Sequence, residues 1–401
     1  MKIIHITASY KPAYIYGGPI QSVAKLCEAL KRIIDRQVTA GNDLPSVHDL
    51  QVLTTTANGK IELEMATGKL NLVEGVPVRY FKRITKDHSH FSPQLLLNLR
   101  NQIFYSLQNE KPIIHIHAWW NLVSVLSCWV ARRYKVPVLL SPRGMLTAYT
   151  QKNRNSFSKK IIHSFIGRSL LEYCHLHATS EQEKQDILKI ITPKSITVIP
   201  NLVKIEEPVG VPQLTISKKN PTVFRLIFLS RVEEKKGLKL LFEALSLLEI
   251  NWQLTIAGSG KDQYINDLKL KAEQLNIGEH INWIGQISNE DKYRLMAQQD
   301  LLVLTSFNEN FANVVVESLS VGTPVLVSDK VGLSDYIIDQ QLGWVSPLDI
   351  DSIKKNLQTA FSQQKKREMI KQSAPEIIRK DFNDEVLANR YLQLYKSFFN
   401  E

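Results

Sequence analysis

Short apolar runs alternate with longer stretches of helical periodicity along the whole chain. In the first half, β-prone runs occupy 3–7, 50–55, 113–117, 138–141 and 197–200. In the second half, they occupy 224–230, 252–258, 281–285 and 301–305. Strands that alternate with helices predict parallel sheets covered by helices, so we expect an α/β fold in each half. The break between the halves is predicted within 201–221, which holds three prolines and no helical period.

The length of 401 residues fits two domains better than one core. We therefore expect domains at 1–204 and 205–381, followed by an amphipathic helix within 382–401. The stretch 35–50 is long and polar for a connection, and we expect it to be a flexible loop. The apolar run at the N-terminus is too short for a signal peptide and no run reaches the length of a membrane span, so we expect a cytoplasmic protein. Three cysteines without ligand spacing are expected to be buried and reduced.

Charge is distributed unevenly between the two halves. Residues 1–204 hold 27 Lys and Arg against 13 Asp and Glu, whereas residues 205–401 hold 23 against 26. A basic first half predicts an anionic partner, such as a lipid phosphate or an anionic membrane surface. The segment 152–168 combines basic and apolar residues in a pattern that suits a helix lying on a membrane, although a helix packed on its own domain would show the same pattern. Nucleic-acid binding is not expected, because the charge comes without a nucleic-acid-binding motif.

Two carboxylates, Glu309 and Glu317, follow the apolar run 301–305 at a spacing of eight positions. If one helix carried both, their side chains would project within roughly 80° of each other. The loop after a strand and the helix that follows form a typical phosphate site in an open α/β sheet. Carboxylates nearby accept hydrogen bonds from sugar hydroxyls, so the segment predicts a nucleotide-sugar site. The alternative is a helix start with Glu309 near its N-terminus and Glu317 at an ordinary solvated position.

The same block resembles the signature of the retaining GT-B-fold glycosyltransferases of family four, the glycosyl transferases group 1. The matching positions are Glu309, Phe311, Glu317, Gly322 and Pro324. Asn310 and Ala312 stand where this family usually has glycine. The resemblance implies two Rossmann-like, doubly wound domains facing a cleft, with the helix at 382–401 packed back on the first domain. It also implies that Glu309 contacts the donor sugar, that Glu317 holds the ribose, and that the backbone around Asn310, Phe311, Asn313, Val314 and Val315 faces the diphosphate.

Other motifs of the chain resemble further elements of this family. Arg231 and Lys236 follow a strand and are expected to neutralise the leaving diphosphate, although a solvated loop would look the same. Gly17 and Gly18 resemble the N-terminal glycine loop that lies against the donor. Gly258 and Gly260 end a strand and are expected to border the base pocket, with an ordinary turn as the alternative.

The first half adds His117 and Arg143 to the candidate residues. His115 and His117 share one face of a strand, but no third metal ligand with suitable spacing is evident, so His117 is expected to face the cleft. Arg143 lies in a Ser-Pro-Arg-Gly-Met motif, where many relatives have a histidine that touches the donor sugar. We expect its guanidinium to bind an anionic or polyhydroxylated group. Ser180 and Asp349 are interpreted as helix caps, and no catalytic metal is expected.

These observations predict a metal-independent retaining glycosyltransferase without a cofactor. It would move a hexose from a UDP- or GDP-sugar to an anionic, glycan or lipid-linked acceptor, in surface polysaccharide biosynthesis, with peripheral membrane contact as one expectation. Its catalytic residues would be Glu309, Arg231, Lys236 and His117. A nucleotide-sugar 2-epimerase of the same fold and a non-catalytic nucleotide-sugar binder are the alternatives. The sequence does not name the nucleotide, the sugar or the acceptor.

Overall fold

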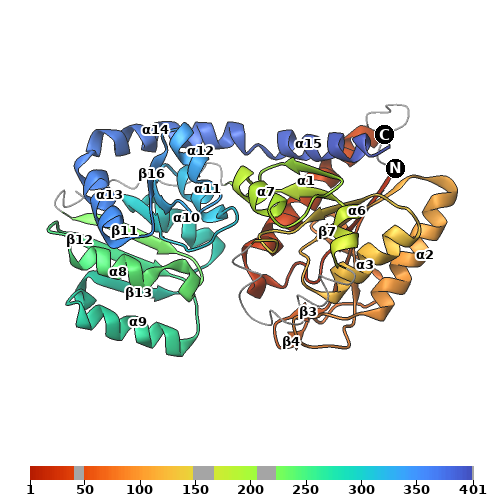
Figure 1. Cartoon of the computed structure of the whole chain (residues 1–401), viewed down its shortest axis with the longest axis horizontal. Coiled ribbons are helices and arrows are strands. Elements are labelled where there is room, and N and C mark those ends of the chain that lie inside the picture. Colours follow the sequence, from red (N-terminus) through yellow and green to blue (C-terminus); the bar gives the residue numbers. More distant parts are fainter. Residues whose placement is uncertain (40–48, 148–166, 206–222, 400–401) are drawn as a thin grey trace. The chain divides into compact units, whose positions relative to one another are not determined.

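The computed structural model describes residues 1–39, 49–147, 167–205 and 223–399. The chain folds into two compact units (Figure 1). Unit 1 comprises Met1–Lys204 together with Phe382–Glu401, and unit 2 comprises Ile205–Asp381. Most of the basic segment 152–168 and most of the expected linker 201–221 lie outside the described residues.

Unit 1 is built on an eight-stranded sheet with the order β10-β9-β8-β7-β1-β2-β6-β5. Its strands are β1 (Lys2–Ile6), β2 (Asp49–Thr55), β5 (Leu70–Val73), β6 (Val76–Phe81), β7 (Pro112–His117), β8 (Val138–Ser141), β9 (His175–Ala178) and β10 (Ser195–Val198). All neighbours are parallel except β5, which runs antiparallel to β6. The hairpin of β3 (Ala57–Asn58) and β4 (Ile61–Glu62) stands beside this sheet. Strands β5, β6 and β9 were missing from the sequence prediction, because polar residues interrupt their apolar positions.

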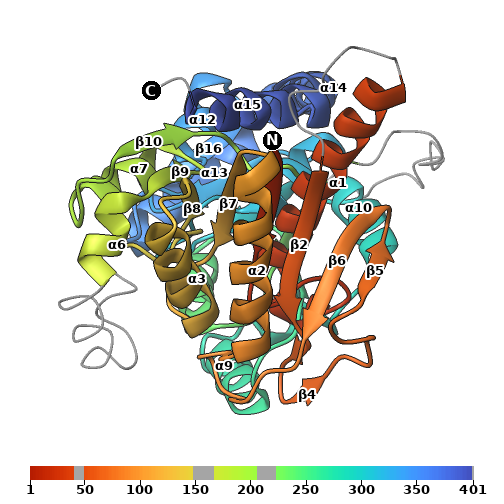
Figure 2. The same cartoon turned by 90° about the vertical axis from the view of Figure 1, so that its right-hand side faces the viewer.

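Two groups of helices cover the sheet of unit 1 on opposite faces (Figure 2). One face carries α1 (Gly18–Thr39) and α15 (Asp384–Ser397). The other face carries α2 (Pro93–Asn109), α3 (Leu122–Arg133), α6 (Arg168–Tyr173) and α7 (Glu181–Leu188). Helix α1 continues to Thr39, so the expectation of a loop from residue 35 is wrong for 35–39, which keep helical hydrogen bonding.

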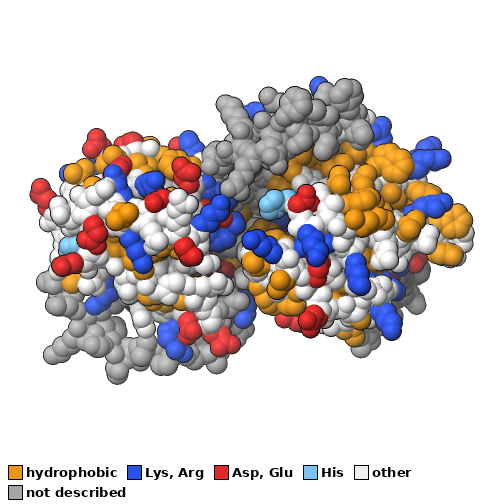
Figure 3. Space-filling view, turned by 90° about the horizontal axis from the view of Figure 1, so that it is seen from below, with side chains coloured by type: hydrophobic (Ala, Val, Ile, Leu, Met, Phe, Trp, Pro, Cys, Tyr) orange, Lys and Arg blue, Asp and Glu red, His pale blue; other side chains and the backbone are white. Residues whose placement is uncertain are grey.

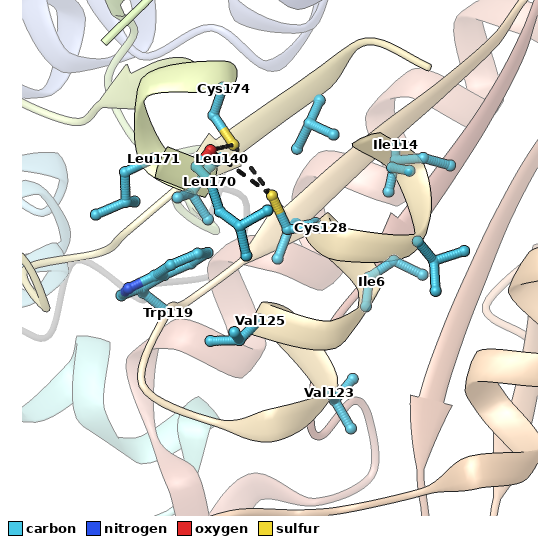
Figure 4. Packing of buried hydrophobic residues seen from close by; sticks show 14 of the residues in the cluster. Ile6, Ile114, Trp119, Val123, Val125, Cys128, Leu140, Leu170, Leu171 and Cys174 are labelled. Atoms are coloured by element: carbon cyan, nitrogen blue, oxygen red, sulfur yellow. Dashed lines mark hydrogen bonds between the residues drawn. The ribbon is translucent and has the colours of Figure 1, made fainter. Parts of the chain in front are cut away.

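The core beneath α3 and α6 contains two of the three cysteines (Figure 4). The Sγ atoms of Cys128 and Cys174 lie 3.4 Å apart, and Cys174 also donates to the carbonyl of Leu170. Cys27 belongs to the core on the α1 side of the sheet. All three thiols are free and buried, as the sequence predicted.

Unit 2 is built on a six-stranded parallel sheet with the order β13-β12-β11-β14-β15-β16. Its strands are β11 (Phe224–Leu229), β12 (Trp252–Ala257), β13 (Ile281–Gly285), β14 (Leu301–Leu304), β15 (Val325–Ser328) and β16 (Gly343–Ser346). Its helices are α8 (Leu238–Ser246), α9 (Asp262–Gln274), α10 (Asn289–Ala297), α11 (Asn313–Ser320), α12 (Ser334–Asp339), α13 (Ile350–Ser362) and α14 (Gln364–Asp381). Helix α8 packs with α9 and α13, whereas α11 packs with α10 and α14. Asp349 caps α13 by accepting the Ser352 N–H at 2.8 Å, as predicted.

Each sheet has a point at which the strand order reverses, between β1 and β7 in unit 1 and between β11 and β14 in unit 2. Both units are therefore Rossmann-like and doubly wound, as predicted. Ligands of such sheets bind outside the carboxyl ends of the strands, at the reversal. In the described part of the chain, no helix is long and apolar enough to cross a membrane.

Candidate active site

In unit 2, the segments that follow β11 and β14 are locked against each other. Gly237 has φ +72°, and a Cβ atom there would come within 1.9 Å of the Thr305 carbonyl oxygen. The Thr305 hydroxyl donates to the Gly237 carbonyl at 3.1 Å, and Phe307 N–H donates to the Lys235 carbonyl at 2.8 Å. Only glycine permits the two backbones to approach so closely, so Gly237 allows the two segments to pack directly against each other.

Glu309 does not lie on a helix, and the prediction that it shares a helix with Glu317 is wrong. Helix α11 begins at Asn313, after Ala312 has taken a left-handed conformation with φ +67°. The backbone of Glu309 instead pairs with the turn after β15, donating to Lys330 O at 3.0 Å and accepting from Gly332 N at 2.8 Å. The Glu309 carboxylate is therefore positioned by backbone hydrogen bonds to that turn and not by a place on a helix.

The Glu309 carboxylate forms an ion pair with Lys236. The Lys236 side chain is 8% exposed and that of Glu309 is 21% exposed, so the pair is largely shielded from water. The structure thus pairs Lys236, which the sequence predicted to bind the diphosphate, with Glu309, which it predicted to contact the donor sugar. Arg231 differs from them, because its half-exposed side chain pairs with Glu233 at 2.8 Å.

Glu317 forms a second buried ion pair, with Lys292 of α10 at 2.7 Å. Both side chains are nearly inaccessible, at 7% and 8% exposed. The alternative of a solvated helix position for Glu317 is therefore excluded. Lys292 was not predictable as a partner of Glu317, because it lies 25 positions away and no spacing in the sequence indicates a pairing between two helices.

At the turn into α11, the backbone is more available to a ligand than the side chains are. Phe311 and Val315 are buried in the core, so they can contribute to a ligand site only through their backbone. The first turn of α11 has no acidic residue and no side-chain cap. Such a helix N-terminus favours an anion, which agrees with the expected place of a diphosphate.

Gly258 and Gly260 have a local reason to be glycine. A Cβ atom at Gly258 would come within 1.8 Å of the Ser230 carbonyl oxygen, and one at Gly260 within 2.3 Å of the Val232 carbonyl oxygen. The two glycines therefore let the end of β12 lie against the segment after β11. This contact accounts for both glycines without a ligand, which agrees with the alternative interpretation of the segment as an ordinary turn.

In unit 1, the glycine loop follows a short 3-10 turn, η1 (Tyr14–Tyr16). Gly17 has φ +73°, a conformation that favours glycine, and Gly18 is the first residue of α1. The Tyr16 hydroxyl accepts a hydrogen bond from Gly59 N at 2.9 Å. The loop is thereby tied to the β3–β4 hairpin at the carboxyl edge of the sheet.

Arg143 lies close to this loop with three neutral partners. Its guanidinium donates to Ser22 Oγ at 3.0 Å, to Asn201 Oδ1 at 2.9 Å and to His117 Nδ1 at 3.4 Å. Its backbone has φ +53°, an uncommon conformation for a side-chain-bearing residue. A cation held by uncharged groups in a strained turn is suited to an anionic ligand.

His117 is buried in the structure and belongs to a chain of hydrogen bonds. Because the guanidinium of Arg143 can only donate, His117 Nδ1 accepts and its Nε2–H donates to His5 Nδ1 at 2.9 Å. Burial and the charge of Arg143 hold the pKa of His117 well below its usual range. His117 is therefore a neutral imidazole near pH 7 and not an imidazolium cation.

A parallel chain of hydrogen bonds joins the two other buried histidines to α15. His177 Nε2–H donates to the Ile199 carbonyl at 2.7 Å, so its Nδ1 accepts from Ser141 Oγ at 2.8 Å. Ser141 in turn accepts from His115 Nε2 at 2.8 Å, and Tyr395 donates to His115 Nδ1 at 2.7 Å. Burial lowers the pKa of His177 to about 3 and holds that of His115 well below its usual range.

Pairing of β1 with β7 brings His5 beside His115, so the structure supplies the third histidine that the sequence lacked. The ligand atoms of His5, His115 and His117 all lie within 4.8 Å of one another. Both nitrogens of His115 and of His117 already take part in hydrogen bonds, however. The group therefore fits neutral, hydrogen-bonded imidazoles better than a metal centre.

Two family models match the chain, one in each half. The model for Glycosyltransferase Family 4 matches residues 42–207, and the model for glycosyl transferases group 1 matches residues 213–377. An uncharacterized glycosyltransferase of Methanocaldococcus jannaschii is 28% identical over 99% of this chain and 98% of its own length. The GDP-mannose:cellobiosyl-diphosphopolyprenol alpha-mannosyltransferase of Xanthomonas oryzae is 22% identical over 82% of this chain and 79% of its own.

Solved glycosyltransferase structures share the fold of the whole chain. Sucrose-phosphate synthase from Thermosynechococcus elongatus has a TM-score of 0.73 at 19% identity and covers 100% of this chain and 99% of its own. HepE of Anabaena, solved in complex with UDP-glucose, has a TM-score of 0.70 at 18% identity and covers 99% and 100%. With one family model on each half and this fold throughout, the chain belongs to the GT-B-fold glycosyltransferases of family 4, glycosyl transferases group 1.

Proposed function

We propose that this glycosyltransferase moves a hexose from a nucleotide-sugar to a glycan or lipid-linked acceptor with retention of configuration. Glycosyltransferases of this group use nucleotide-sugar donors without a separate cofactor. The observation that carries the proposal is the pair of buried ion pairs, Lys236–Glu309 and Lys292–Glu317, beside the strand-order reversal of unit 2. Buried charges are costly, and a protein that retains two such pairs at the ligand-binding edge of a sheet has a use for them.

Each pair supports a separate donor contact. Lys292 fixes one oxygen of Glu317, and the carboxylate can accept the ribose hydroxyls with its remaining lone pairs. Glu309, held by its ion pair with Lys236, would accept the sugar hydroxyls, and the Lys236 cation lies beside the segment that leads into α11, where the diphosphate would bind. Arg231 can leave Glu233 for the diphosphate at small cost, because an exposed ion pair contributes little to stability.

Transfer would need no metal in this proposal. The bond between the sugar C1 and the phosphate oxygen breaks, and the acceptor oxygen forms a bond to C1 on the same face. The acceptor proton passes to the departing diphosphate, whose charge Lys236 and Arg231 stabilise. Neutral His117 would contribute by orienting Arg143, and the cation of Arg143 would bind an anionic or hydroxylated part of a substrate.

Surface polysaccharide biosynthesis at a membrane is the setting we propose, with the acceptor on the basic unit 1. The Xanthomonas relative is named for a lipid-linked acceptor. Helices α2 and α3 expose apolar side chains beside arginines, namely Leu97, Phe104, Tyr105 and Trp129 with Arg100, Arg132 and Arg133. Figure 3 shows hydrophobic side chains gathered on one face of unit 1 with Lys and Arg around them. Such a surface is typical of proteins that lie on anionic membranes.

A thermal-shift panel of UDP-, GDP- and ADP-sugars tests the donor site. A ligand at 100 times its Kd stabilises the folded state by about 2.7 kcal/mol. We expect one nucleotide class to raise the Tm of the wild type and Glu317→Gln to lose most of that shift. The matched control is Glu290→Gln on the exposed surface of α10, which should keep the whole shift.

The outcomes separate this proposal from its alternatives. Conversion of the donor sugar in the absence of any acceptor would identify a nucleotide-sugar 2-epimerase. Donor binding without turnover across a broad acceptor panel would favour a non-catalytic binder. If no nucleotide-sugar changes the Tm, the donor site assigned to unit 2 is wrong.

A further inference from the structure

A pocket of about 710 Å³ opens at the carboxyl edge of the sheet in unit 1, and no residue that lines it belongs to the candidate active site described above. Its wall is formed by Thr56, which follows β2, by Glu62 and Leu63 of the hairpin segment, and by Lys82 and Lys86, which follow β6. This volume is in the range of cavities that hold small ligands. The edge is the one at which parallel strands of this fold bind ligands.

A buried arginine, Arg83, holds the lining of the pocket together by hydrogen bonds. The side chain of Arg83 is 1% exposed and donates from Nε to Glu62 Oε1 at 2.7 Å and from Nη2 to the Gly59 carbonyl at 2.9 Å. Thr56 donates to the other oxygen of Glu62 at 2.6 Å. The charge of Glu62 is thus satisfied within the protein, and the wall is preformed.

The same hydrogen bonds connect the pocket with the glycine loop. Gly59 accepts from Arg83 through its carbonyl and donates from its N–H to the Tyr16 hydroxyl at 2.9 Å. Tyr16 directly precedes Gly17. Two hydrogen bonds at Gly59 therefore link the lining residue Arg83 to the loop that is expected to contact the donor.

The rim of the pocket is basic. Lys82 and Lys86 are exposed, and among the described residues neither ammonium lies within ion-pair distance of a carboxylate. Glu64 also lines the pocket and can accept hydroxyl hydrogen bonds, and Leu63 and Met65 offer apolar surface to a sugar ring. Two ammonium groups, a carboxylate and an apolar patch match a sugar that carries a phosphate or carboxylate.

We propose that this pocket is the acceptor site and that it selects an acceptor with an anionic group, bound by Lys82 and Lys86. The inference rests on the proposed glycosyl transfer and specifies the chemistry of its acceptor. The anion could be the diphosphate of a lipid-linked sugar or the charged group of an acidic glycan.

Calorimetric titration without donor tests the pocket separately from catalysis. The probes are a hexose 1-diphosphate with and without a short alkyl chain, an alkyl hexuronide and the neutral alkyl hexoside. We expect the wild type to bind at least one anionic probe about tenfold or more tightly than the hexoside. Lys82→Ala/Lys86→Ala should abolish that preference, and Lys82→Arg/Lys86→Arg should keep it. Preference for the alkylated diphosphate would identify a lipid-linked acceptor, and preference for the hexuronide an acidic glycan.

The matched control is Lys135→Ala/Lys189→Ala, which removes the same charge from exposed positions of unit 1 outside the pocket. Equal binding of charged and neutral probes by the wild type, or an unchanged preference in the Lys82/Lys86 alanine variant, would overturn the inference. The nucleotide-sugar thermal shift of the same proteins reports on the donor site alone. A lost donor shift with an intact probe preference would count against the proposed function and not against this pocket.

Discussion

The histidine network around His117 in unit 1 and the ion pairs of Glu309 and Glu317 in unit 2 bury polar groups near strand ends by different means. Unit 1 uses neutral histidines that hydrogen-bond to one another, to hydroxyl groups and to a single cation, Arg143. Unit 2 uses two ion pairs between full charges. A neutral network avoids the desolvation of charge but fails when its members gain protons, whereas an ion pair fails when it loses either partner. The histidine network is therefore sensitive to pH, whereas the two ion pairs are sensitive to charge deletion.

The largest expected effect comes from removing one member of a buried pair. Lys292→Ala leaves Glu317 charged and buried, so we expect unit 2 to lose about 3–5 kcal/mol of stability. Hydrogen exchange followed by mass spectrometry resolves this loss at the amides of β14 and α11, with little change at β7. Lys330→Ala, which breaks an exposed pair with Asp329, should change stability by less than about 0.5 kcal/mol. Equal effects from both substitutions would show that burial of the Lys292–Glu317 pair does not make unit 2 depend on it.

Mild acid is expected to destabilise unit 1 selectively. Burial lowers the pKa of His5 and of His177 to about 3, and that of His90 to about 4. The unfolded chain titrates near pH 6.5, so it binds more protons than the folded state below that pH. Stability therefore falls as the pH falls from about 6.5, by up to about 1.4 kcal/mol per pH unit for each such histidine.

Urea unfolding monitored by hydrogen exchange at pH 7.5, 6.0 and 5.0 would measure this dependence in each unit. Unit 2 contains a single histidine, His280, and serves as the internal control. A parallel loss of stability in both units over this range would show that the buried histidines are not responsible.

The smallest expected effect concerns the strained turn before α11. Ala312 has φ +67° where the family usually has glycine, so Ala312→Gly should relieve strain and raise the stability of unit 2 by a few tenths to about 1 kcal/mol. Differential scanning calorimetry of the variant would show a higher Tm. Ala272→Gly inside α9 is the matched control and should lower stability, by about 1 kcal/mol. A lower Tm for Ala312→Gly would mean that the turn is not strained.

Strands and helix caps that depend on neighbouring residues in the chain were predictable from the sequence. The apolar runs of β1, β7, β11 and β14 and the cap at Asp349 depend on neighbouring residues in the chain, and the structure confirms them. Glu309 was misplaced because one left-handed residue, Ala312, delays the helix by several positions, and periodicity does not show such a turn.

Contacts between distant parts of the chain could not be predicted from the sequence. His5 meets His115 only through strand pairing, and Lys292 meets Glu317 only through the packing of α10 on α11. Neither contact leaves a spacing pattern. The chemical types of the site residues were therefore predictable, whereas the pairs that hold them in place were not.

Because the chain returns from unit 2 to unit 1 at its C-terminal end, unit 1 is completed only when the last helix has been synthesised. Tyr395 of α15 donates a hydrogen bond to His115, Tyr391 accepts one from the Nε2–H of His177, and both tyrosines fill the core beside α1. Unit 2 is continuous in sequence, so it can fold as soon as residues through 381 have left the ribosome, while unit 1 must wait for residues beyond 395. The part of the chain that is made first is thus the last to reach its final packing, and until then the nascent protein exposes apolar surface along α1 to chaperones.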